Sequence, residues 1–402
     1  MLTGSLQRAL LKIQVSEFPA PSRQALQLSA ELSSVIRTEI KRAGGSIPFA
    51  RYMELCLYAP GLGYYSAGQR KFGAGGDFVT APEISPLFGR CLANTCRAVL
   101  ESLPGGDILE FGAGSGRLAI DVLAELERAA CLPGRYLILE RSAELRQRQQ
   151  QALQRELPQL LERVAWIDTL PEAGFRGVML ANEVLDAMAV ERFQWDGNTA
   201  GLFHVSRVDD AFQWCLQTPV TETRLAIETL ASSCRLSPGY ISELNTALPV
   251  WLQSVAEPLQ QGVLLLIDYG YPRHEYYHPQ HSSGTLMCHY RQRAHDDPFL
   301  WPGLQDLTAH VDFTAVAEAA VASDLEVSGY TTQTCFLLDS GLDDFLQQAG
   351  PTDSTHYIQL AQQAKTLILP GEMGERFKCI ALTRGLTTAV PGFRLQDFRN
   401  RL

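Results

Sequence analysis

The chain has 402 residues, of which 46% are hydrophobic and only 19% are charged. Such a chain can bury a large core, and its composition excludes a mainly disordered or collagen-like protein. Its 34 basic and 44 acidic side chains give a formal net charge of −10, which argues against nucleic acid as a partner and fits a cationic target better.

Apolar residues at helical spacing dominate the beginning of the chain. They predict helices over 28–43, 47–58 and 84–102. The glycine-rich segment between the second and third of these helices, residues 59–76, is predicted to be a loop or a short hairpin.

From residue 107 onward, apolar strands alternate with amphipathic helices, as in a parallel sheet with crossover helices. The predicted strands are 107–112, 135–140, 163–167, 177–182, 262–269, 325–331 and 377–384. Residues 190–260 mix strand-like and helical runs and are too long for a simple connection, so we expect an inserted α+β subdomain there. A long loop is expected over 270–310.

The segment LEFGAGSGRLAID at 109–121 leads from an apolar strand through a glycine-rich turn into a helix. Alternate glycines, Gly112, Gly114 and Gly116, permit a tight turn and let a ligand lie against the main chain. The spacing is not the G-x-G-x-x-G of dinucleotide binders, and Glu110 lies within the strand end. The turn therefore favours S-adenosylmethionine (SAM) over NAD, with a purely structural strand-to-helix turn as the alternative.

Two acids follow the next predicted strands. Glu140 closes the strand YLILE, where its carboxylate could accept hydrogen bonds from both hydroxyls of a ribose. Asp168 follows the third strand and could bind the adenine amino group, although an Asp in this position is as often a helix cap or a turn former.

The segment MLANEVLDAMAVERF at 179–193 places polar residues directly after the fourth strand. Asn182 is expected beside the cofactor, and Glu183 and Glu191 are the leading pair of catalytic carboxylates. Asp186 is an alternative partner or a general base. Carboxylates suit a guanidinium acceptor, because the planar, always charged arginine head binds them in bidentate fashion.

Six of the eight histidines lie between residues 274 and 310. Their spacing fits no metal signature, so we expect no metal site. His310 and Asp312, in TAHVDF, are candidate substrate-binding residues.

The nine cysteines are odd in number and form no C-x-x-C pair, which argues against a disulfide framework and structural zinc. This usage favours a reducing compartment. The sequence lacks a convincing targeting segment, so a cytoplasmic location is expected. No run approaches the ~20 apolar residues of a membrane span.

Several segments together resemble the MidA-like family of class I SAM-dependent methyltransferases, which includes the mitochondrial protein-arginine methyltransferase that assists assembly of respiratory complex I. They are GGDFVTAPEISPLFG at 75–89, LEFGAGSGRLAID, NEVLDAMAV at 182–190, LLLIDYGYP at 264–272, GTLMCHYRQRAHDDPFLWPGLQDLTAHVDF at 284–313 and MGERFKCIAL at 373–382. The resemblance covers about residues 30 to 385, with the motifs in family order.

The resemblance implies a Rossmann-like methyltransferase core over 105–189 and 261–388, beside an N-terminal extension (1–104) and the insertion (190–260). It also implies that the segment carrying Gly76, Asp77, Thr80, Glu83 and Ser85 closes over SAM. The expected partner is a cationic, arginine-containing protein, such as a complex I subunit. Ala189 replaces a proline that is usual in the family, which loosens the backbone of the acceptor loop.

Two other functions remain open from the sequence. A small-molecule acceptor could enter past the aromatic residues Tyr64, Tyr65 and Phe72. Alternatively, the chain could be a SAM-binding assembly factor that acts without catalysis, with residues 190–260 as its interface.

Overall fold

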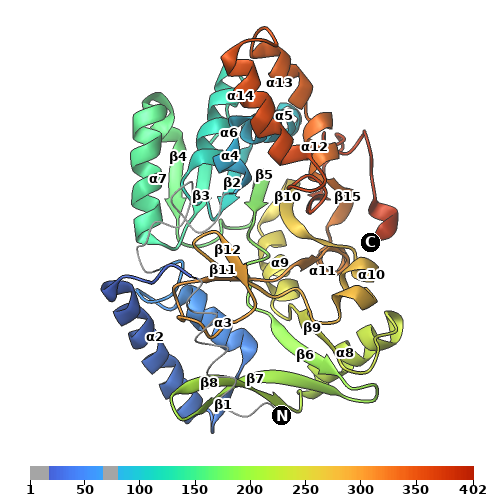
Figure 1. Cartoon of the computed structure of the whole chain (residues 1–402). Helices are drawn as coiled ribbons and strands as arrows, with labels where there is room; N and C mark the ends of the chain where they lie inside the picture. The colour runs from blue at the N-terminus through green and yellow to red at the C-terminus, as the bar shows by residue number, and fades with distance from the viewer. Residues whose placement is uncertain (1–17, 67–79) are drawn as a thin grey trace.

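The computed structural model describes residues 18–66 and 80–402 and contains one dominant sheet (Figure 1). The strand order is β15-β16-β10-β5-β2-β3-β4, with β14 beside β10. The strands are β2 (Asp107–Phe111), β3 (Tyr136–Leu139), β4 (Val164–Ile167), β5 (Phe175–Asn182), β10 (Leu259–Tyr271), β14 (Val311–Asp312), β15 (Glu326–Thr332) and β16 (Phe377–Arg384).

The direction of the strands confirms the predicted doubly wound α/β fold. Strands β4, β3, β2, β5 and β10 are mutually parallel, whereas β16 runs antiparallel to both β10 and β15. The chain order reverses between β2 and β5. A doubly wound sheet opens a crevice at the carboxyl ends of such a strand pair, which is where its ligands bind.

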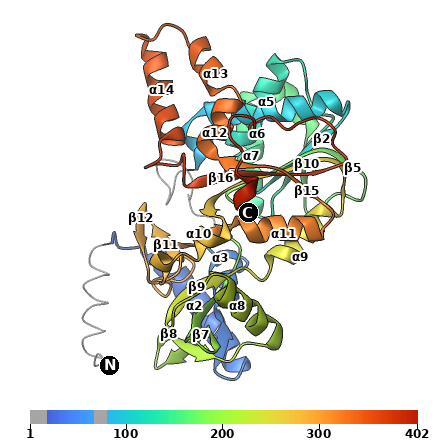
Figure 2. The ribbon, with the colours of Figure 1, turned by 90° about the vertical axis from the view of Figure 1, so that its right-hand side faces the viewer.

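Alternating side chains of the strands build two cores, one on each face of the sheet. Ile108 and Val178 face α5, α6 and α7, whereas their neighbours Leu109 and Met179 face α9 and α11. These helices are α5 (Pro86–Ser102), α6 (Arg117–Arg128), α7 (Ala143–Glu156), α9 (Leu248–Ala256) and α11 (Phe313–Ala322). Three further helices, α12 (Gln333–Asp339), α13 (Leu342–Gln348) and α14 (Thr355–Ile368), extend the first core beside α5 (Figures 1 and 2).

A second sheet lies below the main one in both views (Figures 1 and 2). It joins the N-terminal extension to the insertion, because β1 pairs with β7. Its elements and the helices near it are α2 (Arg23–Arg42), β1 (Ser46–Pro48), α3 (Phe49–Tyr58), β6 (Glu191–Trp195), β7 (Ala200–Val208), β8 (Ala211–Gln217), α8 (Thr221–Ser233) and β9 (Tyr240–Leu244). The domain boundaries given above remain a prediction.

Residues 270–310 are not the long loop expected from the sequence. They contain α10 (Arg273–Tyr276) and a three-stranded sheet of β11 (Met287–Tyr290), β12 (Arg293–His295) and β13 (Asp306–Thr308), ordered β12-β11-β13. Strands of three or four residues are too short to show an alternating pattern, which is why the sequence conceals them. In the view of Figure 1, β11 and β12 are drawn below the main sheet and above α3.

Candidate active site

A cavity of about 1990 Å³ opens at the carboxyl ends of β2 and β5. Its walls come from these strand ends, from α3 and the turn after it, and from the sheet of β11 and β13. Pockets for one small ligand measure roughly 300–1,000 Å³, so this cavity has room for two ligands side by side.

The glycine turn (residues 112–116) lies on the β2 side of the cavity. Gly112, Gly114 and Gly116 have φ angles of +61°, +53° and +85°, a region that side chains disfavour. Gly112 and Gly114 line the cavity, as predicted for cofactor-binding residues. Gly116 does not line it. Gly116 is instead the N-cap residue that precedes α6, and it packs on Gln149, where an added Cβ would lie 3.4 Å from the Gln149 backbone.

Gln149, which the sequence analysis missed, holds this side of the site together. Its amide nitrogen donates to the carbonyl of Gly114 (3.0 Å) and to the carboxylate of Glu140 (3.1 Å), and its amide oxygen accepts from the indole of Trp166 (2.8 Å). The signal was present in α7, because Gln149 stands between Leu145 and Leu153 on the helix face that is otherwise apolar.

Both predicted acids at the β2 and β3 ends line the cavity. Glu140 is 7% exposed and accepts from the backbone N–H of Ser142 at 2.9 Å, while burial raises the pKa of its carboxyl. Burial raises the pKa of Glu110 to about 7, and its carboxylate accepts from the hydroxyl of Tyr136 at 2.8 Å. Asn182, at the end of β5, lines the same cavity.

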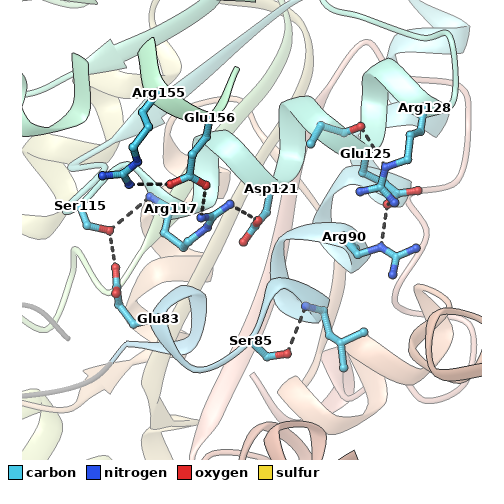
Figure 3. Close-up of polar contacts among 12 residues, drawn as sticks. Glu83, Ser85, Arg90, Ser115, Arg117, Asp121, Glu125, Arg128, Arg155 and Glu156 are labelled. Carbon is cyan, nitrogen blue, oxygen red and sulfur yellow. Dashed lines mark hydrogen bonds and ion pairs between the residues drawn. The ribbon is translucent and has the colours of Figure 1, made fainter. Parts of the chain in front are cut away.

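The segment after residue 79 is fixed to the glycine turn (Figure 3). The hydroxyl of Ser115 donates to Glu83 in the short helix α4 (Ala81–Ile84), and Thr80 before that helix lines the cavity. Ser85 caps α5 by accepting from the backbone N–H of Leu87. Gly76 and Asp77, predicted to contact the cofactor, lie outside the described residues.

Asp168 is not part of the cavity wall, contrary to the predicted contact with adenine. Its side chain is 82% exposed and forms an ion pair with Arg146 at 2.7 Å. The alternative role, a helix cap or a turn former at a strand end, stays a prediction.

The post-strand turn (residues 183–188) follows β5 on the other side of the cavity. Glu183 is half-buried there with a φ of +53°, an unusual conformation for a residue with a side chain. Burial, assisted by the charge of Asp186, raises its pKa to about 8. The amide of Asn182 donates to its carboxylate at 3.0 Å. Strained residues of this kind are concentrated at functional sites.

Asp268, near the end of β10, shapes the post-strand turn and was not identified from the sequence. One of its carboxylate oxygens accepts from the backbone N–H groups of Val184 (3.2 Å), Leu185 (2.9 Å) and Asp186 (3.2 Å). The side chain is buried, and burial raises its pKa. Asp268 therefore positions the turn without lining the cavity.

The other two predicted catalytic acids line the cavity. Asp186 is 6% exposed, and burial raises its pKa to about 6. Burial also raises the pKa of Glu191, whose carboxylate accepts from the backbone N–H of Ala50. Within residues 18–66 and 80–402, Asp186 Oδ1 and Glu191 Oε2 are buried without a hydrogen-bond partner.

The two candidate substrate-binding residues have different positions. His310 lines the cavity between the rings of Tyr269 and Tyr271, and burial lowers its pKa to about 4, so the imidazole is neutral at pH 7. Asp312 lies outside the lining: it caps α11 through the backbone N–H groups of Thr314 and Ala315 and pairs with Arg273 at 3.1 Å. The TAHVDF motif alone does not show which of its two residues lines the cavity and which caps a helix.

Two kinds of site are absent from residues 18–66 and 80–402. Among these residues, no group of three or more potential ligands gathers as a metal site would require. No helix that the structure describes is both long and apolar enough to span a membrane.

Comparisons with curated proteins identify relatives across the chain. The mitochondrial protein arginine methyltransferase NDUFAF7 of Danio rerio is 29% identical over 84% of this chain and 83% of its own length. The NDUFAF7 homologue of Drosophila melanogaster is 29% identical over 93% and 89%, and NDUFAF7 of Homo sapiens is 28% identical over 89% and 83%. All three are named mitochondrial, so the expectation of a cytoplasmic location is wrong.

The comparison with solved structures adds the cofactor. A crystal structure from Burkholderia thailandensis, bound to S-adenosyl-homocysteine, matches 96% of this chain and all of that chain at 43% identity and a TM-score of 0.92. A second structure from the same organism matches the same share at 42% identity and a TM-score of 0.89. S-adenosyl-homocysteine is what remains of SAM after its methyl group is transferred.

The family comparison covers both sides of the cavity. A family model described as "Putative S-adenosyl-L-methionine-dependent methyltransferase" matches residues 87–331, which include the glycine turn, the post-strand turn and β13. The expected cofactor, enzyme class and family are confirmed by these comparisons. The chain belongs to this family of SAM-dependent methyltransferases.

Proposed function

We propose that this methyltransferase transfers the methyl group of SAM to an arginine side chain of a protein. The observation that carries the proposal is the set of three carboxylates in the wall of one cavity, those of the buried Asp186 and the half-buried Glu183 and Glu191. No basic side chain of the described residues forms an ion pair with them, and buried carboxylates need a cationic partner. The names of the curated relatives support an arginine acceptor.

The β2 side of the cavity fits SAM. Gly112 and Gly114 let the main chain approach the ligand closely, and Glu140 offers a carboxylate for the ribose hydroxyls. Thr80, Glu110 and Asn182 complete the proposed cofactor contacts. SAM, when bound, supplies an electrophilic methyl group on a sulfonium.

The β5 side fits the acceptor. Glu183 and Glu191 would bind the guanidinium and orient one nitrogen toward the methyl group. Asp186 would take the place of one of them in binding the guanidinium, or would act as a general base. The carboxylates also keep positive charge on the far nitrogens, which leaves the attacking nitrogen more nucleophilic. As that nitrogen forms its bond to carbon, it loses one proton to a carboxylate or to solvent.

The proposal extends to the identity of the protein that is methylated. We infer from the resemblance to the MidA-like family that a subunit of respiratory complex I is the first candidate. A protein acceptor agrees with the size of the cavity, which exceeds what SAM alone requires.

The test is transfer of labelled methyl from SAM into an extract of cells that lack this gene, followed by hydrolysis. We expect label in methylarginine of a discrete polypeptide with the wild-type chain, and far less label with the Glu183→Gln variant. Label found only in small molecules would refute a protein acceptor. Labelled polypeptide that yields no methylarginine on hydrolysis would refute arginine.

A further inference from the structure

A basic cluster, formed by His310, Arg376 and Lys378, lies at the end of β10. His310 directly precedes β14 and Arg376 directly precedes β16, and both strands pair with the end of β10. The side chains of His310 and Arg376 belong to residues that line the cavity. In the main sheet, β10 and β16 lie on the side of β5 that faces away from β2 and β3. The basic cluster and the glycine turn are therefore on opposite sides of β5.

The cluster is positively charged at neutral pH. Arg376 is exposed at the cavity and always charged, and burial lowers the pKa of Lys378 only to about 8. Burial is also the main cause of the low pKa of His310, and neighbouring positive charges, those of Lys378 and Arg376 among them, add to it. The ammonium of Lys378 donates to the carbonyls of Glu375 and Arg376. Lys378 therefore fixes the segment of chain that carries Arg376.

The basic cluster lacks an anionic partner. Within residues 18–66 and 80–402, no carboxylate forms an ion pair with Arg376 or Lys378. Glu275 acts on Lys378 from a distance, but it pairs with Arg401 and does not line the cavity. In the same part of the chain, Nδ1 of His310 is buried without a hydrogen-bond partner. Buried polar atoms are nearly always hydrogen-bonded, so this orphaned nitrogen indicates a ligand at the wall.

Tyr269 lies between the basic cluster and the post-strand turn. Its ring meets those of His310 and Phe377 edge-on, with centroids 5.2 and 5.5 Å apart. Burial, followed by the charge of Asp186, raises the pKa of its hydroxyl. The backbone N–H of Ala309 donates to the carbonyl of Asp186 at 3.2 Å. Because neighbouring strands are about 4.8 Å apart, the end of β5 and the start of β16 are roughly 10 Å apart, within reach of one peptide.

We propose that His310 and Arg376 bind a carboxylate of the acceptor protein, which belongs to an aspartate or glutamate close to the methylated arginine. The proposal rests on the proposed function. Arg376 would bind the carboxylate through its planar fork of donors, and the neutral His310 would donate from Nδ1. An acceptor with a cation and an anion side by side would then match the acidic and the basic wall of the cavity.

SAM carries a carboxylate of its own, which is a second source of the same chemistry. The proposed SAM contacts are on β2 and β3, across β5 from the basic cluster, so we assign the cluster to the acceptor. The experiment is designed to distinguish the two sources.

The experiment measures binding of peptide-linked SAM analogues to the full chain by calorimetry. In each probe a nitrogen replaces the sulfonium, and a short linker joins it to the guanidine of the central arginine of a pentapeptide with capped ends. Four probes carry one glutamate each, at the four positions around the arginine, and four matched probes carry glutamine. A further glutamine probe has a urea in place of the guanidine. The carboxylate of the SAM part is present in every probe, so it cannot cause a difference between them.

In the wild type, the best glutamate probe should bind about tenfold more tightly than its glutamine counterpart, as expected for charge-assisted hydrogen bonds. Arg376→Gln should lose most of this preference, and Arg376→Lys, which keeps the charge without the fork, should retain part of it. His310→Phe keeps a ring beside Tyr269 and should weaken the preference by a smaller factor. Arg141→Gln is the matched control and should keep the preference, because Arg141 is also exposed and lines the cavity but lies just after β3.

The outcomes separate this inference from the function on which it rests. Equal binding of the guanidine and urea probes by the wild type would overturn the arginine acceptor, and this inference with it. A preference for guanidine without any preference for glutamate would overturn only the acidic acceptor. A glutamate preference that survives in both Arg376→Gln and His310→Phe would overturn the role of these two residues. Weaker binding of S-adenosyl-homocysteine by Arg376→Gln would assign the cluster to the carboxylate of the cofactor instead.

Discussion

Two neighbouring strands of the main sheet end in the same backbone conformation but with different residues. Gly112, directly after β2, has a φ of +61°, and Glu183, directly after β5, has a φ of +53°. Glycine adopts this conformation freely, whereas glutamate does so at a cost of roughly 1–3 kcal/mol. The first turn is therefore built for close approach of the main chain to a ligand. The second keeps a residue with a side chain in a strained backbone conformation, which indicates that the carboxylate itself is needed.

The largest effect is expected from a side chain added to the glycine turn. Gly114→Val should abolish SAM binding, because a β-branched residue at a φ of +53° is strained and this position lines the cavity. Calorimetric titration with SAM checks this. Gly105→Val is the control, since Gly105 has a φ of +76°, lies in open space and does not line the cavity. Unchanged SAM affinity in Gly114→Val would show that the glycines serve only the turn.

The next effect concerns the post-strand turn. Glu183→Gln keeps the shape of the side chain and removes its charge, so methyl transfer should fall by roughly 10²–10³ while SAM binds as before. Initial rates and SAM titration of the same preparation give both numbers. Normal methylation by Glu183→Gln would rule out a guanidinium held by this carboxylate, and the contrast between the two turns would then lose its functional meaning.

Asp268 tests whether the shape of the post-strand turn matters apart from the carboxylates in the wall. Asp268→Asn loses the charge that binds three backbone N–H groups, and the free energy of unfolding should fall by about 1–3 kcal/mol. Denaturant unfolding measures this loss. The methylation rate should fall about tenfold at saturating SAM, as expected when a positioning residue is lost. A stability loss with an unchanged rate would make Asp268 structural only.

The contrast between the glycine turn and the post-strand turn also explains how much of the molecule could be predicted from the sequence. The glycine turn is contiguous in sequence, so its position, its place after β2 and its cofactor followed from one motif. The positions of most strands of the main sheet along the chain followed from their apolar runs, whereas their order in the sheet did not. The other side of the cavity is assembled from the end of α3, the turn after β5, the end of β10 and β13, whose contacts no local pattern encodes.

Particular residues illustrate this limit. Asp268 reads in sequence as one more strand-end acid, and only the fold shows that it binds the post-strand turn. Asp312 has the appearance of a site residue because it lies near His310, yet it caps a helix. In sequence, Tyr65 is one aromatic residue of a glycine-rich loop. In the structure its hydroxyl donates a hydrogen bond to Asp306, which lies 241 positions further along the chain.

The smallest expected effect is a change in the pH dependence of methyl transfer, and it concerns the carboxylates of the post-strand turn. Glu183 and Asp186, with pKa values of about 8 and about 6, bind a guanidinium best when charged. The wild-type rate at saturating SAM should therefore rise several-fold between pH 6 and about pH 8. In Glu183→Gln the rise near pH 8 should disappear and the one near pH 6 remain. Two other carboxylates, those of Asp268 and Asp306, also interact with the charge of Glu183. Because both are present in the wild type and in Glu183→Gln, they do not account for the difference between the two pH profiles.

Stability gives an independent check with a defined sign. The pKa of Glu183 in the folded chain lies above its ordinary value of 4.5, so its contribution to stability is complete below pH 4.5 and is lost as the pH rises through about 8. Unfolding free energies of the wild type should therefore fall across this range relative to those of Glu183→Gln, which has no proton to lose. Parallel stability curves would mean that Glu183 is already ionised in the folded protein, and the rise in rate near pH 8 would then need another group.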